Sequence, residues 1–238
     1  TLSADQMKMP KAKRSYFAVD VFAEHPLSNG WYGKVNYTFA KNKGNTEGQT
    51  LSDVAQTDVA ATQTWDTPEL MMGAYGYLPN DRRHQIKAFG YYQVTPEITV
   101  GANLLLASGR PKNCIGNFGG TPGTYPDADH TFDDVDYGSA FRWCTVNGVT
   151  TATPRGAAGN LPWDKRLDLN IAFRPSAIKG LEFKIDVFNA FNKQTIEAID
   201  EVHEVNFDKD TITPTYGRVI SYSAPRAIKF SLTYDMKF

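Results

Sequence analysis

The chain has 238 residues, of which 25 are Lys or Arg and 26 are Asp or Glu, and its mean hydropathy is −0.42. A net charge of −1 gives no bulk attraction to nucleic acid. No stretch approaches the roughly 20 apolar residues that a membrane helix needs. Hydrophobic residues at 41% and aromatic residues at 13% are too frequent for a disordered chain. The opening segment TLSADQMKMP has no initiator methionine and no signal-peptide pattern, which fits a mature protein or a fragment of a longer one.

Apolar and polar residues alternate with period 2 from the first part of the chain onward. Such alternation predicts strands with one apolar and one polar face. Phe17, Val19 and Val21 share a face of the first predicted strand, and Val35, Tyr37 and Phe39 share a face of the second. The first four predicted strands cover residues 15–25, 30–42, 81–94 and 97–108.

The same pattern continues to the last residue. Leu167, Leu169, Ile171 and Phe173 alternate with polar residues, as do Leu181, Phe183, Ile185 and Val187. In the final run, RAIKFSLTYDMKF, every second residue from Ile228 to Phe238 is apolar. These segments predict three further strands over 162–174, 181–194 and 223–238.

The predicted strands are long, and the links between them alternate strictly between short and long. The links have about 4, 38, 2, 53, 6 and 28 residues. Soluble strands usually have about 5–6 residues, whereas a tilted strand that crosses a bilayer needs about 9–11. Long loops on one side and short turns on the other are typical of outer-membrane barrels. A terminal strand that ends at the periplasmic side puts the long links 43–80, 109–161 and 195–222 outside.

Aromatic residues lie near the ends of the predicted strands, where a membrane barrel carries its interfacial girdles. They are Trp31, Tyr32, Tyr91, Tyr92, Trp163 and Phe238. The alternative is a soluble β-sandwich whose core these rings pack, but sandwich strands are shorter and sandwich loops less lopsided. Seven is an odd number of strands, whereas bacterial single-chain barrels have an even number. We therefore expect the last part of a larger barrel.

Three segments resemble the C-terminal barrel of TonB-dependent outer-membrane receptors. They are LPWDKRLDLNIAF (161–173), DVFNAFN (186–192) and YGRVISYSAPRAIKFSLTYDMKF (216–238). NDRRHQIKAFG (80–90), RPKNC (110–114) and SYSAPR resemble the Oar-like (OmpA-related) branch. The resemblance implies an all-β fold: a transmembrane antiparallel β-barrel fragment with about seven C-terminal strands of a barrel of about 22 strands. Residues 1–14 would be an extracellular loop remnant and 15–238 the C-terminal part of the barrel, with the plug domain absent from this chain.

We find no motif for catalysis, a cofactor or a metal. G-x-S-x-G, H-E-x-x-H and G-x-x-x-x-G-K-[ST] are all missing from the sequence. The four histidines show no metal-ligand spacing to one another: His25, His84, His130 and His203. We therefore expect a protein that is not an enzyme and has no cofactor.

The longest outward link holds both cysteines and an acidic run. Cys114 and Cys144 are separated by 29 residues in a loop that would face an oxidising exterior, so we expect a disulfide. The run PDADHTFDDVD (126–136) has five aspartates but lacks the spaced Gly and the terminal Glu of an EF-hand loop. It fits a solvated acidic loop better than a calcium site.

The three long links together carry 16 acidic and 7 basic residues, so the rest of the chain has a net charge of +8. Acidic loops could attract cationic ligands while a basic lumen guides anions or a plug. The simpler interpretation, which we prefer narrowly, is that the loops are solvated and that basic residues at the strand ends meet lipid phosphates.

Two sets of residues are candidates for ligand contact. Inward polar residues would line the lumen, where they would hydrogen-bond a plug or follow the substrate path: Lys34, Asn36, Lys87, Asn103, Arg166, Asp168, Asn170, Lys184 and Asp186. Aromatic residues of the outward links could clamp a ligand or, equally, pack the loops against one another: Trp65, Tyr75, Tyr125, Tyr137, Phe141 and Trp143.

The resemblance implies a receptor-transporter that captures a ligand with its outer loops and passes it through a plugged barrel. TonB would act through the missing N-terminal part. The barrel-assembly machinery would read the terminal strand, with Phe238 as its signal, and the wall would meet outer-membrane lipid and lipopolysaccharide. The ligand is unknown, with siderophore, carbohydrate and peptide all open. The alternatives are a passive porin-like channel and a secreted β-rich binding module.

Overall fold

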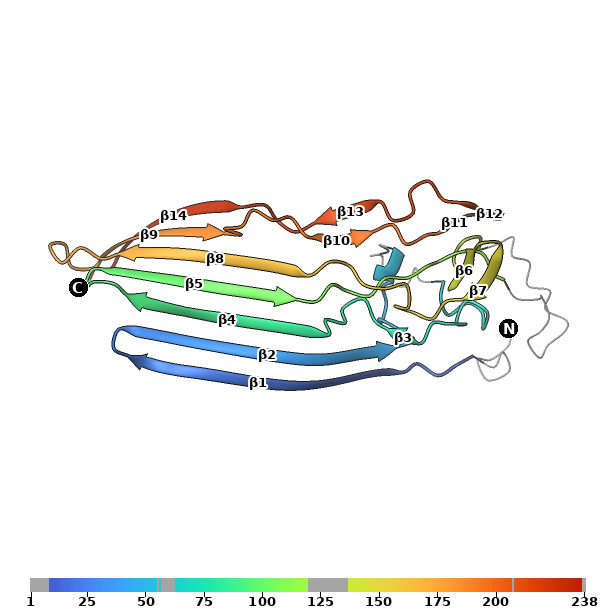
Figure 1. Cartoon of the computed structure of the whole chain (residues 1–238), viewed down its shortest axis with the longest axis horizontal. Helices are drawn as coiled ribbons and strands as arrows, with labels where there is room; N and C mark the ends of the chain where they lie inside the picture. Colours follow the sequence, from blue (N-terminus) through green and yellow to red (C-terminus); the bar gives the residue numbers. More distant parts are fainter. Residues whose placement is uncertain (1–8, 55, 57–62, 120–136, 207, 237–238) are drawn as a thin grey trace.

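In a computed structural model, the described residues are 9–54, 56, 63–119, 137–206 and 208–236. Seven long antiparallel strands run side by side along the longest axis of the molecule (Figure 1). In order across the sheet they are β1 (Arg14–Ser28), β2 (Trp31–Gly44), β4 (His84–Gln93), β5 (Ile98–Ala107), β8 (Asp164–Phe173), β9 (Leu181–Phe188) and β14 (Ala227–Tyr234). The short β3 (Gly76–Tyr77) pairs with the end of β2. These are the seven strands that the alternation predicts.

Two predicted boundaries are wrong, at the junction between β9 and β14. Strand β9 ends at Phe188 instead of 194, because Asn189 and Asn192 take positive φ angles of 48° and 51° that an extended strand does not allow. Strand β14 begins at Ala227 instead of 223. Residues 237–238, and with them the proposed assembly signal Phe238, lie outside the described residues.

The register joins the apolar faces of all seven strands into one continuous surface. Successive pairs across the sheet are apolar on both sides, from Val21↔Tyr37 and Val35↔Ala88 through Leu104↔Leu167 and Ile171↔Ile185 to Phe230↔Ile185. Much of this surface is exposed, with Phe230 at 74% and Leu232 at 66% of its full accessible area. An apolar surface of this extent is stable only against another apolar medium, as in a membrane-spanning barrel wall.

At the end of the sheet where the turns are short, only two of the four predicted girdle rings lie on the apolar face. Trp31 pairs with Tyr92 on the apolar face, and their side chains are 41% and 51% exposed. Tyr32 pairs with Tyr91 on the opposite, polar face, where the two rings stack at 5.6 Å. Neighbouring residues of a strand point to opposite faces, so the pairs Trp31-Tyr32 and Tyr91-Tyr92 each contribute one ring to the apolar face.

Short turns gather at one end of the sheet, and all three long links gather at the other end (Figure 1). The β1–β2 turn is formed by Asn29 (φ 49°) and Gly30 (φ 79°), as in a type I′ hairpin, where both central residues need positive φ. The segregation of short and long links confirms the predicted arrangement of outer loops and inner turns.

The long links contain secondary structure of their own. Strand β6 (Trp143–Val146) pairs with β7 (Val149–Ala152), β10 (Ile196–Ile199) with β13 (Val219–Tyr222), and β11 (Glu204–Val205) with β12 (Asp208–Ile212). A single 3-10 turn, η1 (Ser52–Val54), lies in the first long link. Within the described residues, no helix has the length and apolar character required to traverse a lipid bilayer.

The buried core lies in the links rather than in the sheet. Leu70, Phe118 and Phe141 are at most 4% exposed and pack together, with Tyr137 and Trp143 against them. The long links therefore form a packed unit, here called the outer cap (residues 45–83, 108–163 and 189–226, as far as they are described). The sheet below it has two free edges, β1 and β14, which pair with no further strand among the described residues.

Candidate functional site

The polar face of the sheet is the first candidate site. The register places all nine predicted lumen residues on this face. Cross-strand neighbours include Asn36↔Lys87, Asn103↔Asp168 and Asn170↔Asp186. Near the inner turns this face borders a hollow of about 900 Å³ lined by polar and aromatic side chains, among them Tyr32, Asn103, Asn170, Arg174 and Lys184. That these residues line a lumen remains a prediction, but they share one surface.

Several charges on the polar face are paired within the sheet. Lys34 contacts Glu24 at 2.9 Å, and Lys184 contacts Asp186 at 2.8 Å. Arg166 contacts Asp164 at 3.2 Å. These side chains are partly exposed, so each pair contributes little to stability and leaves the charges accessible to a third group.

The outer cap is the second candidate site, and a buried ionic network lies at its centre. The Asp53 carboxylate accepts hydrogen bonds from Arg142 at 2.5 Å and from the Asn113 amide at 2.9 Å, and it lies 3.3 Å from Arg155. The same Asn113 side chain donates to Glu201 at 2.7 Å. The network therefore ties together η1, the 109–161 link and the 195–222 link.

Glu201 anchors the other half of this network. Arg110 donates to its carboxylate at 2.7 Å, and the Asn113 backbone N–H donates at 3.0 Å. Asp53 and Glu201 are 2% and 1% exposed, so their charges are stable only because these donors replace water. The loop acids are thus partly internal, and the expectation that they are simply solvated is wrong for these two residues.

The two carboxyl groups have pKa values that are shifted in opposite directions. Burial raises the pKa of Asp53, but the nearby Arg142 and Arg155 outweigh it and hold the pKa below its usual value of 3.8. Burial also raises the pKa of Glu201, and there Arg110 and Asn113 do not offset it, so the pKa stays above 4.5. Asp53 is flanked by two guanidinium groups and Glu201 by one, and the Asp53 charge itself raises the pKa of Glu201 further.

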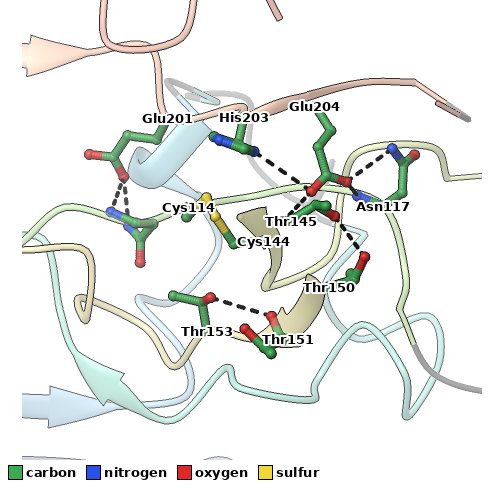
Figure 2. Close-up of a disulfide and its surroundings, with 11 residues drawn as sticks. Cys114, Asn117, Cys144, Thr145, Thr150, Thr151, Thr153, Glu201, His203 and Glu204 are labelled. Carbon is green, nitrogen blue, oxygen red and sulfur yellow. Dashed lines mark hydrogen bonds and ion pairs between the residues drawn. A yellow bond between two sulfur atoms is a disulfide. The ribbon is translucent and has the colours of Figure 1, made fainter. Parts of the chain in front are cut away.

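A third buried acid, Glu204, fastens the β11 segment to the 109–161 link. Its carboxylate accepts hydrogen bonds from the backbone N–H groups of Thr145 at 2.6 Å and Asn117 at 2.8 Å (Figure 2). Gly116 is needed at this point, since a Cβ there would lie 2.6 Å from the Glu204 carboxyl carbon. Glu204 is 1% exposed, so it too departs from the expectation of solvated loop acids.

The predicted disulfide is formed. Cys114 and Cys144 are joined with their Cα atoms 5.6 Å apart, and His203 lies beside them (Figure 2). The sulfur atoms and the His203 ring nitrogen fall within 4.8 Å of one another, a spacing that could suit a metal ion. Both sulfurs are committed to the disulfide, however, and only thiolates bind metals well. The bond instead pins residue 114 to β6, next to the Gly116–Phe141 backbone bridge.

The predicted loop aromatics divide between packing and exposure. Phe141 is fully buried, and its ring lies 5.3 Å from that of Phe118. Trp143 packs edge-on against the same Phe118 at 5.4 Å, and the Tyr137 hydroxyl donates to Asp66. These three rings pack the cap, the second of the two roles that the sequence left open.

The remaining predicted aromatics lie elsewhere. Tyr75 is 44% exposed at the edge of the cap, and Trp65 is half-buried. Tyr125 and the acidic run 126–136 lie outside the described residues. A hollow of about 270 Å³ within the cap is lined by side chains that include Thr64, Tyr137, Ser139, Arg142 and Asn206. Of the candidate rings that the structure describes, only Tyr137 borders this hollow.

Sequence reasoning missed the residues that organise the cap, namely Asp53, Arg110, Asn113, Glu201 and Glu204. Nothing in their spacing marks them, because their partners lie up to 91 positions away in the chain. The β6–β7 hairpin had a signal that was overlooked. Asn147 and Gly148, both at positive φ, form the Asn-Gly turn that is typical of a two-residue hairpin.

Comparison with known proteins adds to this geometry. No family model matches the chain. The chain is 27% identical over 263 aligned positions to the TonB-dependent transporter Oar of Myxococcus xanthus, and the match covers 95% of this chain and 23% of that protein.

Among solved structures, the outer-membrane transporter YddB of Escherichia coli aligns with a TM-score of 0.54 and 11% identity, over 94% of this chain and 25% of that one. The ferric-catecholate import receptor Fiu of E. coli aligns with a TM-score of 0.48 and 16% identity, over 93% and 21%. The chain thus spans about a quarter of the length of the proteins that it matches.

Proposed function

We propose that this chain, which is homologous to the TonB-dependent transporter Oar and forms part of an outer-membrane barrel of a Gram-negative bacterium, is the ligand-capturing C-terminal portion of a TonB-dependent receptor. The observation that carries this proposal is the alignment with the Oar transporter along 95% of the chain. Its relatives are transporters and receptors, and none is an enzyme.

The chain's residues would divide the work between the two ends of the molecule. The outer cap would capture the ligand, and its exposed rim includes Tyr75. The polar face of the sheet, with Lys34, Asn103 and Asp168, would line the path below or contact a plug. Its charges can exchange partners on the sheet for partners on a ligand or plug, because they are only partly buried.

Release would require a conformational change that the chain itself does not drive. A ligand held by the cap moves inward only if a second state of the receptor binds it more weakly or opens the path. TonB, acting through the N-terminal part of the whole protein, would supply that change. The terminal strand would present the barrel-assembly signal, and the exposed apolar face would meet outer-membrane lipid.

Two alternatives predict different behaviour. A passive porin-like channel would conduct ions steadily, and a secreted binding module would not need detergent. The exposed apolar surface, from Val21 on β1 to Leu232 on β14, weighs against the soluble alternative.

Planar-bilayer recording of the whole protein, purified in detergent from outer membranes, tests the proposal. We expect no steady conductance, because a plugged receptor is closed at rest. Steady ohmic conductance from the intact protein would overturn the proposal in favour of the porin-like channel.

A further inference from the structure

A cluster of cations lies on the membrane-facing side of the sheet, at the outer ends of β1, β2 and β3. Lys41 and Lys43 follow Phe39 on the same face of β2, since alternate residues of a strand share a face. Lys43 lies opposite Ser15 of β1 on one side and Tyr77 of β3 on the other. Lys13 extends the same face beyond the start of β1. We call Lys13, Lys41 and Lys43 the outer-rim lysines.

Aromatic rings hold these lysines in place. The ammonium of Lys43 lies 4.4 Å from the centre of the Tyr77 ring, and that of Lys41 lies 5.6 Å from the Phe39 ring. Lys13 lies 5.5 Å from the Tyr75 ring. Cations over aromatic faces at such distances are attracted by the ring quadrupole, which orders long side chains that would otherwise be mobile.

The cluster has an excess of positive charge. Arg83 stacks on Tyr77 at 4.3 Å, and the nearby Asp81 carboxylate pairs with it at 3.1 Å. None of the three outer-rim lysines forms a salt bridge with another residue that the structure describes. Burial raises the pKa of Tyr77, but these same cations, Arg83 and Lys43, outweigh it and lower the pKa below its usual value of 10.0.

The residues along β2 follow the depth profile of one membrane leaflet. Val35 is followed on the same face by Tyr37 and Phe39, and then by Lys41 and Lys43. The Tyr37 hydroxyl contacts His84 at 2.8 Å, and His84 stacks near Trp163 at 6.2 Å, so an aromatic belt lies just inside the lysines. At about 3.4 Å per residue, Lys43 is about 14 Å of strand beyond Phe39, far enough to reach the headgroup level when Phe39 lies in the aromatic belt.

From this arrangement we propose that the outer-rim lysines bind the phosphate groups of lipopolysaccharide in the outer leaflet. Three ordered ammonium groups on one face, with no carboxylate partner among the residues that the structure describes, suit a ligand with more than one phosphate. The glycolipid anchor of lipopolysaccharide carries such groups at this depth. The inference rests on the outer-membrane placement of the chain and does not depend on which ligand the receptor transports.

The test measures lipid binding to the whole detergent-purified protein by native mass spectrometry. The probes are bisphosphorylated lipid A and the same lipid after removal of both phosphates. A variant with Lys13→Gln, Lys41→Gln and Lys43→Gln should bind bisphosphorylated lipid A about 100-fold more weakly, since each cation near an anionic membrane surface contributes roughly fivefold. The control changes Lys179, in the β8–β9 turn at the far end of the sheet, and Lys229, on the polar face, to Gln, and we expect its lipid binding to equal that of the wild type.

Two further arms keep the proposal open to refutation. Replacing the outer-rim lysines by Arg should retain binding, because Arg keeps the charge and the stacking. If the Gln variant does not fold, the wild-type protein alone still tests the proposal. It should bind the dephosphorylated lipid far more weakly than the bisphosphorylated form. Equal binding of the two lipids, or full binding by a folded Gln variant, would overturn the proposal. Neither result would affect the conductance test of the receptor function.

Discussion

Asp53, in the first long link, shows how one residue can hold together three separate stretches of the 109–161 link. Its carboxylate is contacted by Arg142, Arg155 and Asn113, none of which lies on a neighbouring element of the chain. Such a buried charge is tolerated because each desolvated group has a partner. Removing one partner leaves the remaining buried charge uncompensated, which costs desolvation free energy. The cap is therefore sensitive to single substitutions that a solvated loop would tolerate.

We predict that Asp53→Asn destabilises the outer cap by about 3–5 kcal/mol, since it leaves the buried guanidinium of Arg142 without its carboxylate partner and leaves Arg155 with Glu47 alone, at 2.7 Å. Hydrogen exchange of the backbone amides around Gly116 and Phe141 should accelerate, while exchange in β5 and β8 should not change. Asp210→Asn is the control, because Asp210 is an exposed cap acid. Equal protection in Asp53→Asn and wild type would contradict the role assigned to the network.

The pH dependence of that difference follows from the lowered pKa of Asp53. A carboxyl group whose folded pKa lies below its unfolded value contributes its full stabilisation above the unfolded pKa of 3.8. The contribution is lost as the pH falls through the folded pKa. We therefore expect the difference in cap protection between wild type and Asp53→Asn to be constant from pH 7 to pH 5 and to shrink below 3.8. A difference that disappears near pH 6 would show that another group is responsible.

Asn189, in the DVFNAFN segment, fixes the point where β9 ends. Its backbone takes a φ of 48°, and its side chain donates to the carbonyl groups of Lys193 and Ala224 and accepts from the Lys193 N–H. The residue is 4% exposed, so these bonds are shielded from water. It ends β9 and secures the return of the chain to β14.

We predict that Asn189→Ala destabilises the β9–β14 junction by about 2–4 kcal/mol, through lost hydrogen bonds and an unfavourable φ. Asn189→Gly relieves the backbone but not the hydrogen bonds, and we expect it to fall between Ala and wild type. The measurement is proteolytic resistance of the folded whole protein. Identical effects of Ala and Gly would show that the backbone conformation is unimportant.

At the scale of the element, each strand has two faces that meet different media. Leu232 on β14 is 66% exposed on the apolar face, opposite Phe183, whereas Ser231 and Lys229 face the polar side. The free-energy cost of placing a charged side chain on a strand therefore depends on whether that position belongs to the apolar or the polar face. This asymmetry separates a membrane wall from the core of a soluble sandwich.

We predict that Leu232→Arg destabilises the protein folded in phospholipid vesicles, lowering its free energy of unfolding by about 2–4 kcal/mol, while Ser231→Arg on the same strand has little effect. Urea titration of the whole protein with vesicles measures both. Lys229→Leu, which adds an apolar side chain to the polar face, should leave vesicle folding intact. If Leu232→Arg folded as well as Ser231→Arg, the apolar face would not meet lipid.

The seven long strands and their faces could be predicted because period-2 alternation is local information. The end of β9 could not, since the positive φ of Asn189 and Asn192 depends on hydrogen bonds to the far side of the β9–β14 link. The disulfide could be predicted because both cysteines lie in a link expected to face an oxidising exterior. The networks around Asp53 and Glu201 could not be predicted. Their partners come from links separated by up to 91 positions, and an acidic residue in a loop looks the same whether it is solvated or buried.

At the scale of the whole molecule, the described sheet has two open edges, and its outer cap has a core of its own. Unpaired strand edges in a membrane leave backbone groups without hydrogen-bond partners, which the hydrocarbon region does not tolerate. Further strands must therefore pair with β1 and β14 in the membrane, and the alignment with about a quarter of the Oar transporter is consistent with strands supplied by the rest of a longer chain.

The intact mass of the polypeptide extracted from outer membranes with detergent tests the central claim most directly. If this chain is one segment of a plug-and-barrel receptor, mass spectrometry of the native protein should give a value several-fold above 26.5 kDa. A native polypeptide of about 26.5 kDa, or one that stays in solution without detergent, would contradict the receptor and leave a self-assembling or soluble β protein.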